Sequence, residues 1–108
     1  MFEIIITPKF LRLLKKLTKK YPSLSQEFLV LGQQLRANPF IGTPIGNDCY
    51  KIRISIASKG KGKSGGARAI THIVVKEEKL YFLSIYDKSE IDNLPDKEIL
   101  KLIKDKDL

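Results

Sequence analysis

The spacing of the hydrophobic residues changes at the middle of this chain, and that change limits the folds open to it. From position 8 to 37, leucines and phenylalanines recur every three or four residues, as they do on one face of an α-helix. From position 50 to 56, the stretch YKIRISI alternates strictly, with its isoleucines on one side, as in a half-buried strand. A helical first half followed by a strand-forming second half predicts an α+β fold.

Two helices are predicted in the first half, after a short N-terminal strand. Thr7 is suited to cap the first helix and Pro8 to begin it, and the helical spacing ends near Lys20. Ser23, with Gln26 three residues later, has the form of a capping box that opens the second helix. Because the link between the two helices is short, they are predicted to form an antiparallel hairpin.

The second half is predicted to contain three strands and a final short helix. Residues 40–49, which include a proline and two glycines, are predicted to be a loop. The strands are expected over residues 50–56, 68–75 and 80–86, with a tight turn over 76–79. Asp96 is expected to begin the helix. The apolar side of that helix would carry Ile99, Leu100 and Ile103.

The predicted order is therefore strand, helix, helix, three strands and helix, in a single domain that spans the 108 residues. The sheet is expected to be small and mainly antiparallel, with the N-terminal helical hairpin on one face and a short C-terminal helix. The period of two in a strand places Ile52, Ile54 and Ile56 under the hairpin. Lys51 and Arg53 then point to the opposite face.

The charge of the chain points to a polyanionic or acidic partner. Twenty lysines and arginines outnumber twelve aspartates and glutamates, which leaves a net charge of +8. A small basic domain suits a nucleic acid or an acidic protein. A solvated surface tuned for solubility is the alternative, so the placement of the charges matters more than their sum. Neither a metal nor another cofactor is expected, because one histidine and one cysteine do not make a zinc site.

The chain shows no feature of an exported or membrane-bound protein. No apolar run approaches the roughly 18 residues that a membrane span needs. The N-terminus lacks the basic lead and the small-residue cleavage site of a signal peptide. The single Cys49 can form no internal disulfide, which fits a reducing compartment. We therefore expect a cytoplasmic protein with no membrane contact.

Basic residues gather on the predicted sheet face turned away from the hairpin. Lys51 and Arg53 come from one strand. The neighbouring strands would add Arg68, His72, Ser84, Tyr86 and Lys88. This surface is expected to be concave, to have no carboxylate nearby and to bind phosphates. Tyr86 or His72 would stack on an exposed RNA base.

Such a surface holds the groups that RNA cleavage needs. RNA carries its own nucleophile, the 2′-hydroxyl. An enzyme then supplies a base to deprotonate it, donors to stabilise the pentavalent phosphorane and an acid for the leaving 5′-oxygen. Crowding by like charges disfavours the protonated form of a lysine, which makes Lys51 the candidate base. The simpler interpretation is a solvated sheet face, with His72 half-buried and Tyr86 packed as an ordinary aromatic.

The stretch SKGKGKSGGAR, residues 58–68, shares only a Lys-Ser pair with a nucleotide-binding P-loop. A P-loop needs a glycine where Ala57 stands and a helix afterwards, whereas a β-branched run follows here. We expect instead a connection between two strands. Its Lys59, Lys61 and Lys63 would meet the phosphates of an RNA backbone or of ribosomal RNA through charge.

The second half also resembles a known family. The run Tyr50-Lys51-Ile52-Arg53 is followed by GKGKSGGARAI at 60–70 and by LYFLSIYDKSE at 80–90. These blocks are similar to the RelE/HigB-like toxins of bacterial type II toxin–antitoxin systems. The order of strands and helices also matches, so the resemblance spans essentially the whole chain.

The resemblance implies an mRNA endonuclease that inhibits translation by cutting messages in the ribosomal A site. It implies attack by the 2′-hydroxyl without a metal, to give a 2′,3′-cyclic phosphate and a 5′-hydroxyl. The implied partners are a cognate antitoxin that covers the basic surface, mRNA and ribosomal RNA. Operator DNA would be bound only through the antitoxin complex.

The same resemblance assigns roles to the basic residues. Lys51 is the implied proton acceptor, and Arg53 and Arg68 are the implied phosphate clamps. Lys88 is the implied further phosphate contact. The superfamily also includes ParE-type gyrase poisons and inactive members, so a gyrase inhibitor or a non-catalytic binding module stays open. The basic cluster on the sheet face favours RNA cleavage, since a gyrase poison has no need of it.

One family feature is absent. Some members place a catalytic tyrosine near the C-terminal end, around the position of Asn93, and no tyrosine follows Tyr86 here. Either Tyr86 or His72 would take over base stacking or proton transfer, or the chemistry would be slower, or the activity would be lost. Lys15 and Lys19 of the first helix are further candidate ribosome contacts, although the solvent-facing side of a helix is their simpler explanation.

Overall fold

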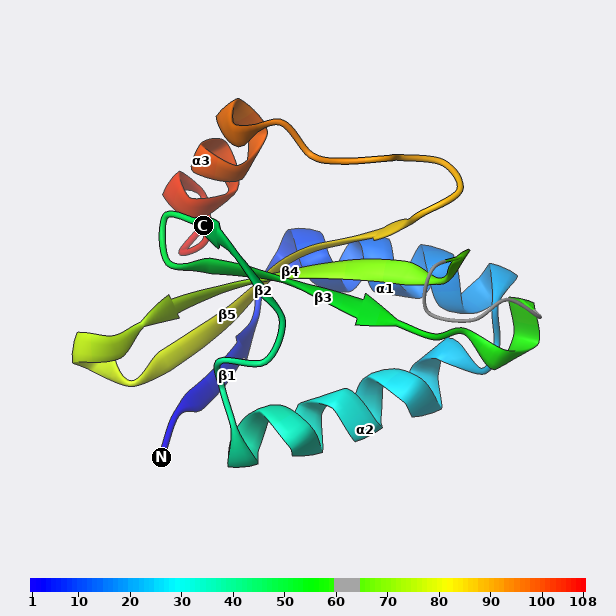
Figure 1. Ribbon diagram of the computed structural model, residues 1–108, viewed down its shortest axis with the longest axis horizontal. Coiled ribbons are helices and arrows are strands. Elements are labelled where there is room, and N and C mark those ends of the chain that lie inside the picture. Colours follow the sequence, from blue (N-terminus) through cyan, green and yellow to red (C-terminus); the bar gives the residue numbers. More distant parts are fainter. Residues whose placement is uncertain (60–64) are drawn as a thin grey trace.

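The structure is a computed structural model that describes residues 1–59 and 65–108 (Figure 1). The helices are α1 (Pro8–Lys20), α2 (Leu24–Ala37) and α3 (Asp96–Lys104). The strands are β1 (Glu3–Ile6), β2 (Thr43–Gly46), β3 (Cys49–Ile54), β4 (Ala67–Val74) and β5 (Lys79–Asp87). The short 3₁₀ helices η1 (Ala57–Lys59) and η3 (Val75–Glu77) come after β3 and β4, respectively.

The five strands form one mixed sheet in the order β1-β5-β4-β3-β2. β1 lies parallel to β5, and the other neighbouring strands are antiparallel. Figure 1 shows α1 running in one direction and α2 returning in the other, with α3 on the opposite side of the strands from α2. The predicted α+β class, the mainly antiparallel sheet and the helical hairpin are confirmed.

The strand β2 was not predicted, and the interpretation of residues 40–49 as a loop is wrong. β2 pairs with β3 in an antiparallel hairpin. The two residues between them, Asn47 and Asp48, have φ angles of 55° and 57°, which is the geometry of a tight type I′ turn. Pro44 favoured the prediction of a loop. A proline is nevertheless tolerated on an edge strand such as β2, where its missing N–H is not needed.

The two N-terminal helices have the predicted bounds, but only the first has the predicted cap. The Thr7 hydroxyl accepts a hydrogen bond from the Phe10 backbone N–H at 3.3 Å. The capping box of α2 is wrong, because Ser23 itself has helical backbone angles and makes no cap bond. Its hydroxyl instead contacts Glu27 at 3.1 Å and accepts a hydrogen bond from the Ser58 backbone N–H at 2.9 Å. A tertiary contact with η1 thus replaces the local cap.

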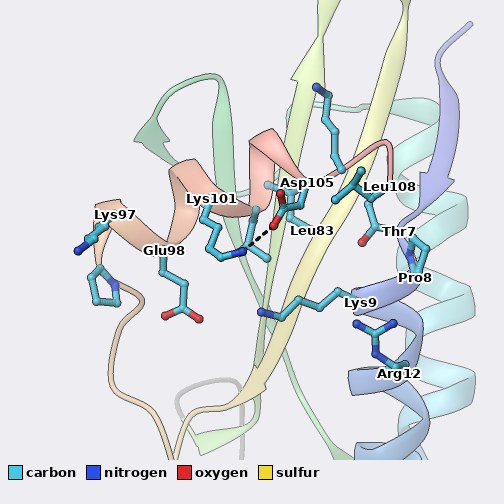
Figure 2. Close-up of a pocket in the computed structure, with 13 residues that line it drawn as sticks. Thr7, Pro8, Lys9, Arg12, Leu83, Lys97, Glu98, Lys101, Asp105 and Leu108 are labelled. Carbon is cyan, nitrogen blue, oxygen red and sulfur yellow. Dashed lines mark hydrogen bonds and ion pairs between the residues drawn. The ribbon is translucent and has the colours of Figure 1, made fainter.

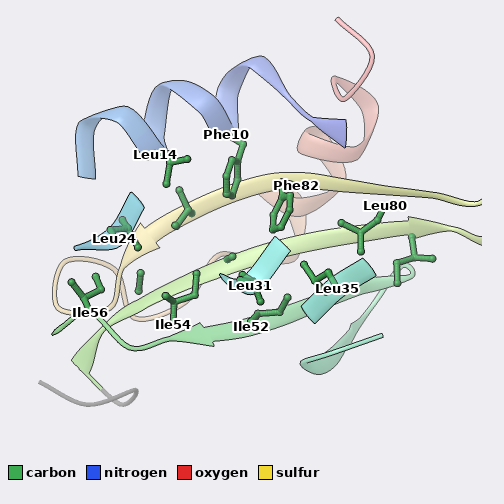
Figure 3. Close-up of a cluster of buried hydrophobic side chains, with 14 residues drawn as sticks. Phe10, Leu14, Leu24, Leu31, Leu35, Ile52, Ile54, Ile56, Leu80 and Phe82 are labelled. Atoms are coloured by element: carbon green, nitrogen blue, oxygen red, sulfur yellow. The ribbon is translucent and has the colours of Figure 1, made fainter. Parts of the chain in front are cut away.

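The main hydrophobic core lies between the sheet and the helical hairpin. Figure 3 shows Phe10 of α1 meeting Phe82 of β5, and their ring centroids are 4.8 Å apart. The three isoleucines predicted to face the hairpin, Ile52, Ile54 and Ile56, are all buried in this core. The alternation of β3 was therefore assigned to the correct faces.

A second apolar cluster covers part of the opposite face, and α3 builds it. Ile99 and Leu102 of α3 pack there on Ile70, Tyr81 and Leu83. The expected apolar side of α3 is thus wrong at Leu100, which is 52% exposed. Within residues 1–59 and 65–108, no helix has the length and apolar character needed to cross a membrane.

Candidate functional site

Three of the predicted site residues form one row across the sheet. Arg53 of β3 lies opposite Arg68 of β4, and Arg68 lies opposite Tyr86 of β5. Residues opposite one another in neighbouring strands share a face and have Cβ atoms about 5 Å apart. Two guanidinium groups and a phenol are therefore brought together on one face of the sheet.

The two arginines differ in their surroundings. Arg53 is exposed, whereas Arg68 is 4% exposed and donates from Nη1 to the carbonyl of Ala67 at 3.0 Å. Burial, and next the positive charge of Arg53, lower the pKa of Arg68. An arginine keeps its proton at neutral pH even so. The pair therefore concentrates two positive charges, and an anion above them would reduce their mutual repulsion.

Tyr86 forms the floor of this site. Its side chain is 5% exposed, and its hydroxyl has no hydrogen-bond partner among the residues that the structure describes. A buried polar group without a partner is costly, so such a group is a candidate for contact with a ligand. Burial raises the pKa of Tyr86, and the charge of Arg68 only partly offsets this effect. The hydroxyl therefore holds its proton at neutral pH and can donate it.

Lys51 and Lys88 flank the row, and the segment between β5 and α3 contacts both. The Lys51 Nζ donates to Asn93 Oδ1 at 3.1 Å. The Lys88 Nζ donates to the Asp92 carboxylate at 2.7 Å and to the Asp92 carbonyl at 2.9 Å. The expectation of a surface without a nearby carboxylate is therefore wrong. Asn93 and Asp92 were missed as site residues, because no periodic pattern places a loop over a particular strand.

His72 does not belong to the open basic surface. It lies four residues from Arg68 along β4, which corresponds to about 13 Å. It is 8% exposed, with its Nδ1 3.5 Å from the sulfur of Cys49. Burial, and next the charge of Lys106, lower the pKa of His72, so the ring is neutral at pH 7. The ring is thus buried and lies apart from the row of Arg53, Arg68 and Tyr86, and its stacking on an RNA base stays a prediction.

The lysines predicted to contact RNA from the connection between β3 and β4 are only partly described by the structure. The Lys59 side chain is 8% exposed, and its ammonium group pairs with the Asp87 carboxylate. It anchors the connection and is not presented to RNA, which corrects that assignment. Lys61 and Lys63 lie outside the described residues. Lys15 and Lys19 are exposed on α1, away from the row of Arg53, Arg68 and Tyr86.

Sequence comparison places this chain among known toxins. A family model described as the RelE toxin of the RelE/RelB toxin–antitoxin system matches residues 11–105. The chain belongs to the RelE toxin family. Membership in a family of toxin–antitoxin systems implies an antitoxin as its partner.

Solved RelE structures share the fold of this family member. The isolated Escherichia coli RelE toxin, in a P21 crystal form, has a TM-score of 0.57 and 18% sequence identity, over 95% of this chain and 99% of that chain. A mutant of E. coli RelE with two arginines replaced by alanine, in the free state, has a TM-score of 0.57 and 17% identity. That match covers 84% of this chain and 87% of the mutant.

Asp87 of this RelE-family toxin was not predicted, yet it holds the site together from below. Its carboxylate accepts hydrogen bonds from the Tyr21 hydroxyl at 2.8 Å and from the Ser89 backbone N–H at 2.9 Å, besides the pairing with Lys59. Burial alone would raise the pKa of Asp87, but these hydrogen bonds outweigh it and hold the pKa well below its ordinary value. The strand period gives the missed signal, since it turns Asp87 toward the core, where a carboxylate needs a cation.

We expect the Asp87→Asn variant to be about 2 kcal/mol less stable at pH 7, because it leaves the buried Lys59 ammonium without its counter-ion. The folded pKa of Asp87 lies below the unfolded value of about 4. The stabilisation is therefore complete above that pH and is lost as the pH falls toward the folded value. Urea unfolding of the intact chain and of Asp87→Asn at pH 7 and pH 3 gives the difference between their free energies of unfolding. A difference at pH 3 as large as at pH 7 would contradict the prediction.

Proposed function

We propose that this RelE-family toxin is an endoribonuclease that cuts messenger RNA during translation. The observation that carries the proposal is the row of Arg53, Arg68 and Tyr86, flanked by Lys51 and Lys88. Two clustered arginines suit a phosphate, and a protonated phenol beside them suits a leaving oxygen. The family match supports the same activity.

The proposed reaction uses groups on this chain and on the RNA. Lys51 serves as the acceptor of the proton of a 2′-hydroxyl, whose oxygen attacks the adjacent phosphorus. Arg53 and Arg68 stabilise the negative charge that develops on the phosphorane. Tyr86 donates its proton to the departing 5′-oxygen, and Lys88 binds a neighbouring phosphate. The products are a 2′,3′-cyclic phosphate and a 5′-hydroxyl.

In this proposal, contacts with RNA replace the contacts that Lys51 and Lys88 make with the loop. In the free protein the Asp92 carboxylate pairs with the Lys88 ammonium group, and the Asp92 side chain is 98% exposed. An exposed ion pair is weak, so a phosphate oxygen can replace the carboxylate at little cost. The neutral side-chain amide of Asn93 similarly accepts a hydrogen bond from Lys51. The loop thereby holds both lysines in place for the substrate.

We expect the Asp92→Asn variant to bind RNA about two- to fivefold more tightly, because Lys88 is then free of a competing carboxylate. A 2′-O-methyl RNA, which cannot be cut, serves as the ligand in a fluorescence anisotropy titration. The matched control is Asp105→Asn, which removes the same charge from another exposed pair, Lys101–Asp105, at 2.8 Å. Equal tightening in both variants would show an effect of net charge alone.

The partners follow from the same proposal. The ribosome presents the codon in its A site, and ribosomal RNA supplies further phosphates for the basic surface. A cognate antitoxin inhibits the toxin, and operator DNA is bound only through that complex. The test is to map new RNA 5′ ends in bacteria after brief induction of the chain, with an uninduced culture as control. Cuts inside translated codons are expected. Growth arrest without cuts would instead support a gyrase poison, and no arrest would support a binding module.

A further inference from the structure

Three segments of the chain meet at the buried carboxylate of Asp87, the residue that ends β5 and precedes Lys88. The Tyr21 hydroxyl, at the end of α1, donates to Asp87 Oδ2 at 2.8 Å. The Lys59 ammonium group of η1 pairs with Oδ1 of the same carboxylate. The backbone N–H and the hydroxyl of Ser89 also donate to Oδ1, at 2.9 Å and 2.7 Å. The Asp87 side chain is therefore held from α1, from η1 and from the segment that follows β5.

Further contacts join these groups to one another. Lys59 also donates to the Ser89 hydroxyl at 3.2 Å. The Lys59 Nζ lies 5.3 Å from the centroid of the Tyr21 ring, a distance at which an aromatic ring attracts a cation. Hydrogen bonds to a charged group are strong, and they are stronger where little water reaches them. Tyr21, Lys59, Asp87 and Ser89 therefore form one connected network that keeps a single arrangement.

The network fixes the backbone on both sides of Lys88. Asp87 precedes Lys88 and Ser89 follows it, and both belong to the network. The Lys88 backbone N–H donates to the Gly66 carbonyl at 3.0 Å, and the Asp87 carbonyl accepts the Glu90 N–H at 3.0 Å. The directions open to a side chain depend on the backbone that carries it. These contacts therefore set where the Lys88 ammonium group can reach.

We infer that Tyr21 and Lys59 are positioning residues for RNA, because through Asp87 they hold Lys88 where it meets a phosphate of the substrate. This role rests on the proposed function, since it takes RNA as the ligand and Lys88 as a phosphate contact. Neither Tyr21 nor Lys59 touches the RNA in this role. The alternative is a network that only stabilises the fold. Breaking such a network would lower the folded fraction and leave the RNA contacts of the folded molecules unchanged.

The dependence of RNA binding on salt separates these two roles. Each phosphate contact releases counterions, so the logarithm of the association constant falls with the logarithm of the salt concentration, with a slope of about 0.7 per contact for a single strand. A partly unfolded variant binds more weakly by the same factor at every salt concentration and keeps the slope. A variant that misplaces Lys88 loses a contact, and its slope becomes shallower.

The chain offers two matched pairs of substitutions. Lys88→Gln removes a lysine that pairs with the aspartate four residues later. Lys101→Gln does the same on α3, where Figure 2 shows Lys101 beside Asp105. Tyr21→Phe removes a hydroxyl that donates to an aspartate. Tyr81→Phe removes another, which donates at 3.2 Å to an aspartate near the C-terminus.

The probe is a single-stranded 2′-O-methyl RNA, titrated by fluorescence anisotropy at several salt concentrations. We expect Lys88→Gln to reduce the slope by about 0.7, and Tyr21→Phe, which changes no charge, to reduce it by at least about 0.3. Both controls should keep the slope of the intact chain to within about 0.2. Adding Lys59→Met or Tyr21→Phe to Lys88→Gln should cause no further reduction, because both residues act through Lys88. Thermal melts give the temperature at which every variant is folded.

Several outcomes would overturn the inference. An unchanged slope in Tyr21→Phe would mean that the network only stabilises the fold. An equal reduction in Tyr81→Phe would mean that the effect is not specific to the network. A further reduction when Lys59→Met is added would make Lys59 a phosphate contact itself. An unchanged slope in Lys88→Gln, or no binding by the intact chain, would leave no contact for the network to hold. Since the probe cannot be cut, a failure of RNA cleavage leaves these slopes unaffected.

Discussion

The Arg53→Gln variant is expected to cleave RNA about 100- to 1,000-fold more slowly than the intact toxin, which is the usual loss when a donor to a developing oxyanion is removed. Glutamine keeps a polar side chain but removes the positive charge beside Arg68. Because Arg53 is exposed, the substitution should change the free energy of unfolding by less than about 0.5 kcal/mol. This makes Arg53 a cleaner test than Arg68, whose side chain is buried.

The measurement is single-turnover cleavage of an mRNA bound to ribosomes, with the enzyme in excess. The control is Arg36→Gln, which removes an equal charge from an exposed residue in the last turn of α2. That control should keep the rate within about twofold, since it lies outside the row. A rate in Arg53→Gln as high as that of the control would be incompatible with the proposed phosphate clamp.

The Gly66→Ala variant is expected to lose more than about 4 kcal/mol of stability, which leaves a small domain largely unfolded. A Cβ at position 66 would overlap the carbonyl oxygen of Ile54 and lie 3.0 Å from its carbonyl carbon. Both atoms are backbone, so β3 and β4 would have to separate to admit a methyl group. The Gly66 carbonyl also accepts the Lys88 backbone N–H at 3.0 Å, so the shift would displace a proposed site residue.

Gly32 provides the matched control for this substitution. It lies within α2, and a Cβ there would meet no other atom within 4 Å. Gly32→Ala is therefore expected to raise the stability by about 0.5–1 kcal/mol, through the higher helix propensity of alanine. Chemical denaturation of both variants gives the comparison. If Gly66→Ala unfolded at the denaturant concentration of the intact chain, the close approach of β3 and β4 would be disproved.

The basic row shows how far sequence reasoning could reach. Arg53 was placed opposite the hairpin by alternation alone, and its exposure agrees with that placement. Arg68 was assigned to the same face, but its burial was not foreseen. Alternation gives the side on which a residue points, whereas burial depends on what else packs on that side. The tyrosine of the row follows the same rule, since Tyr86 was predicted on this face and lies opposite Arg68 in the neighbouring strand.

The connections between elements escaped prediction for a related reason. Asn93 reaches Lys51, and Asp87 holds Lys59, across separations of 42 and 28 residues. The Asn93 contact has no local signal, because a loop has no periodicity that would register it against a distant strand. The strand period turns Asp87 toward the core but does not identify Lys59 as its partner. The edge strand β2 was missed because its proline and glycines have the composition of a turn.

The sequence by itself determined the elements that carry a strong period. It predicted the bounds of α1 and α2, the core-facing side of β3 and the family blocks around Arg53 and Arg68. Only the tertiary structure decided that Arg53 stays exposed while Arg68 and His72 are buried. The spacing of hydrophobic residues is a property of one segment of the chain. Burial arises where segments far apart in the chain meet, and no single segment encodes that meeting.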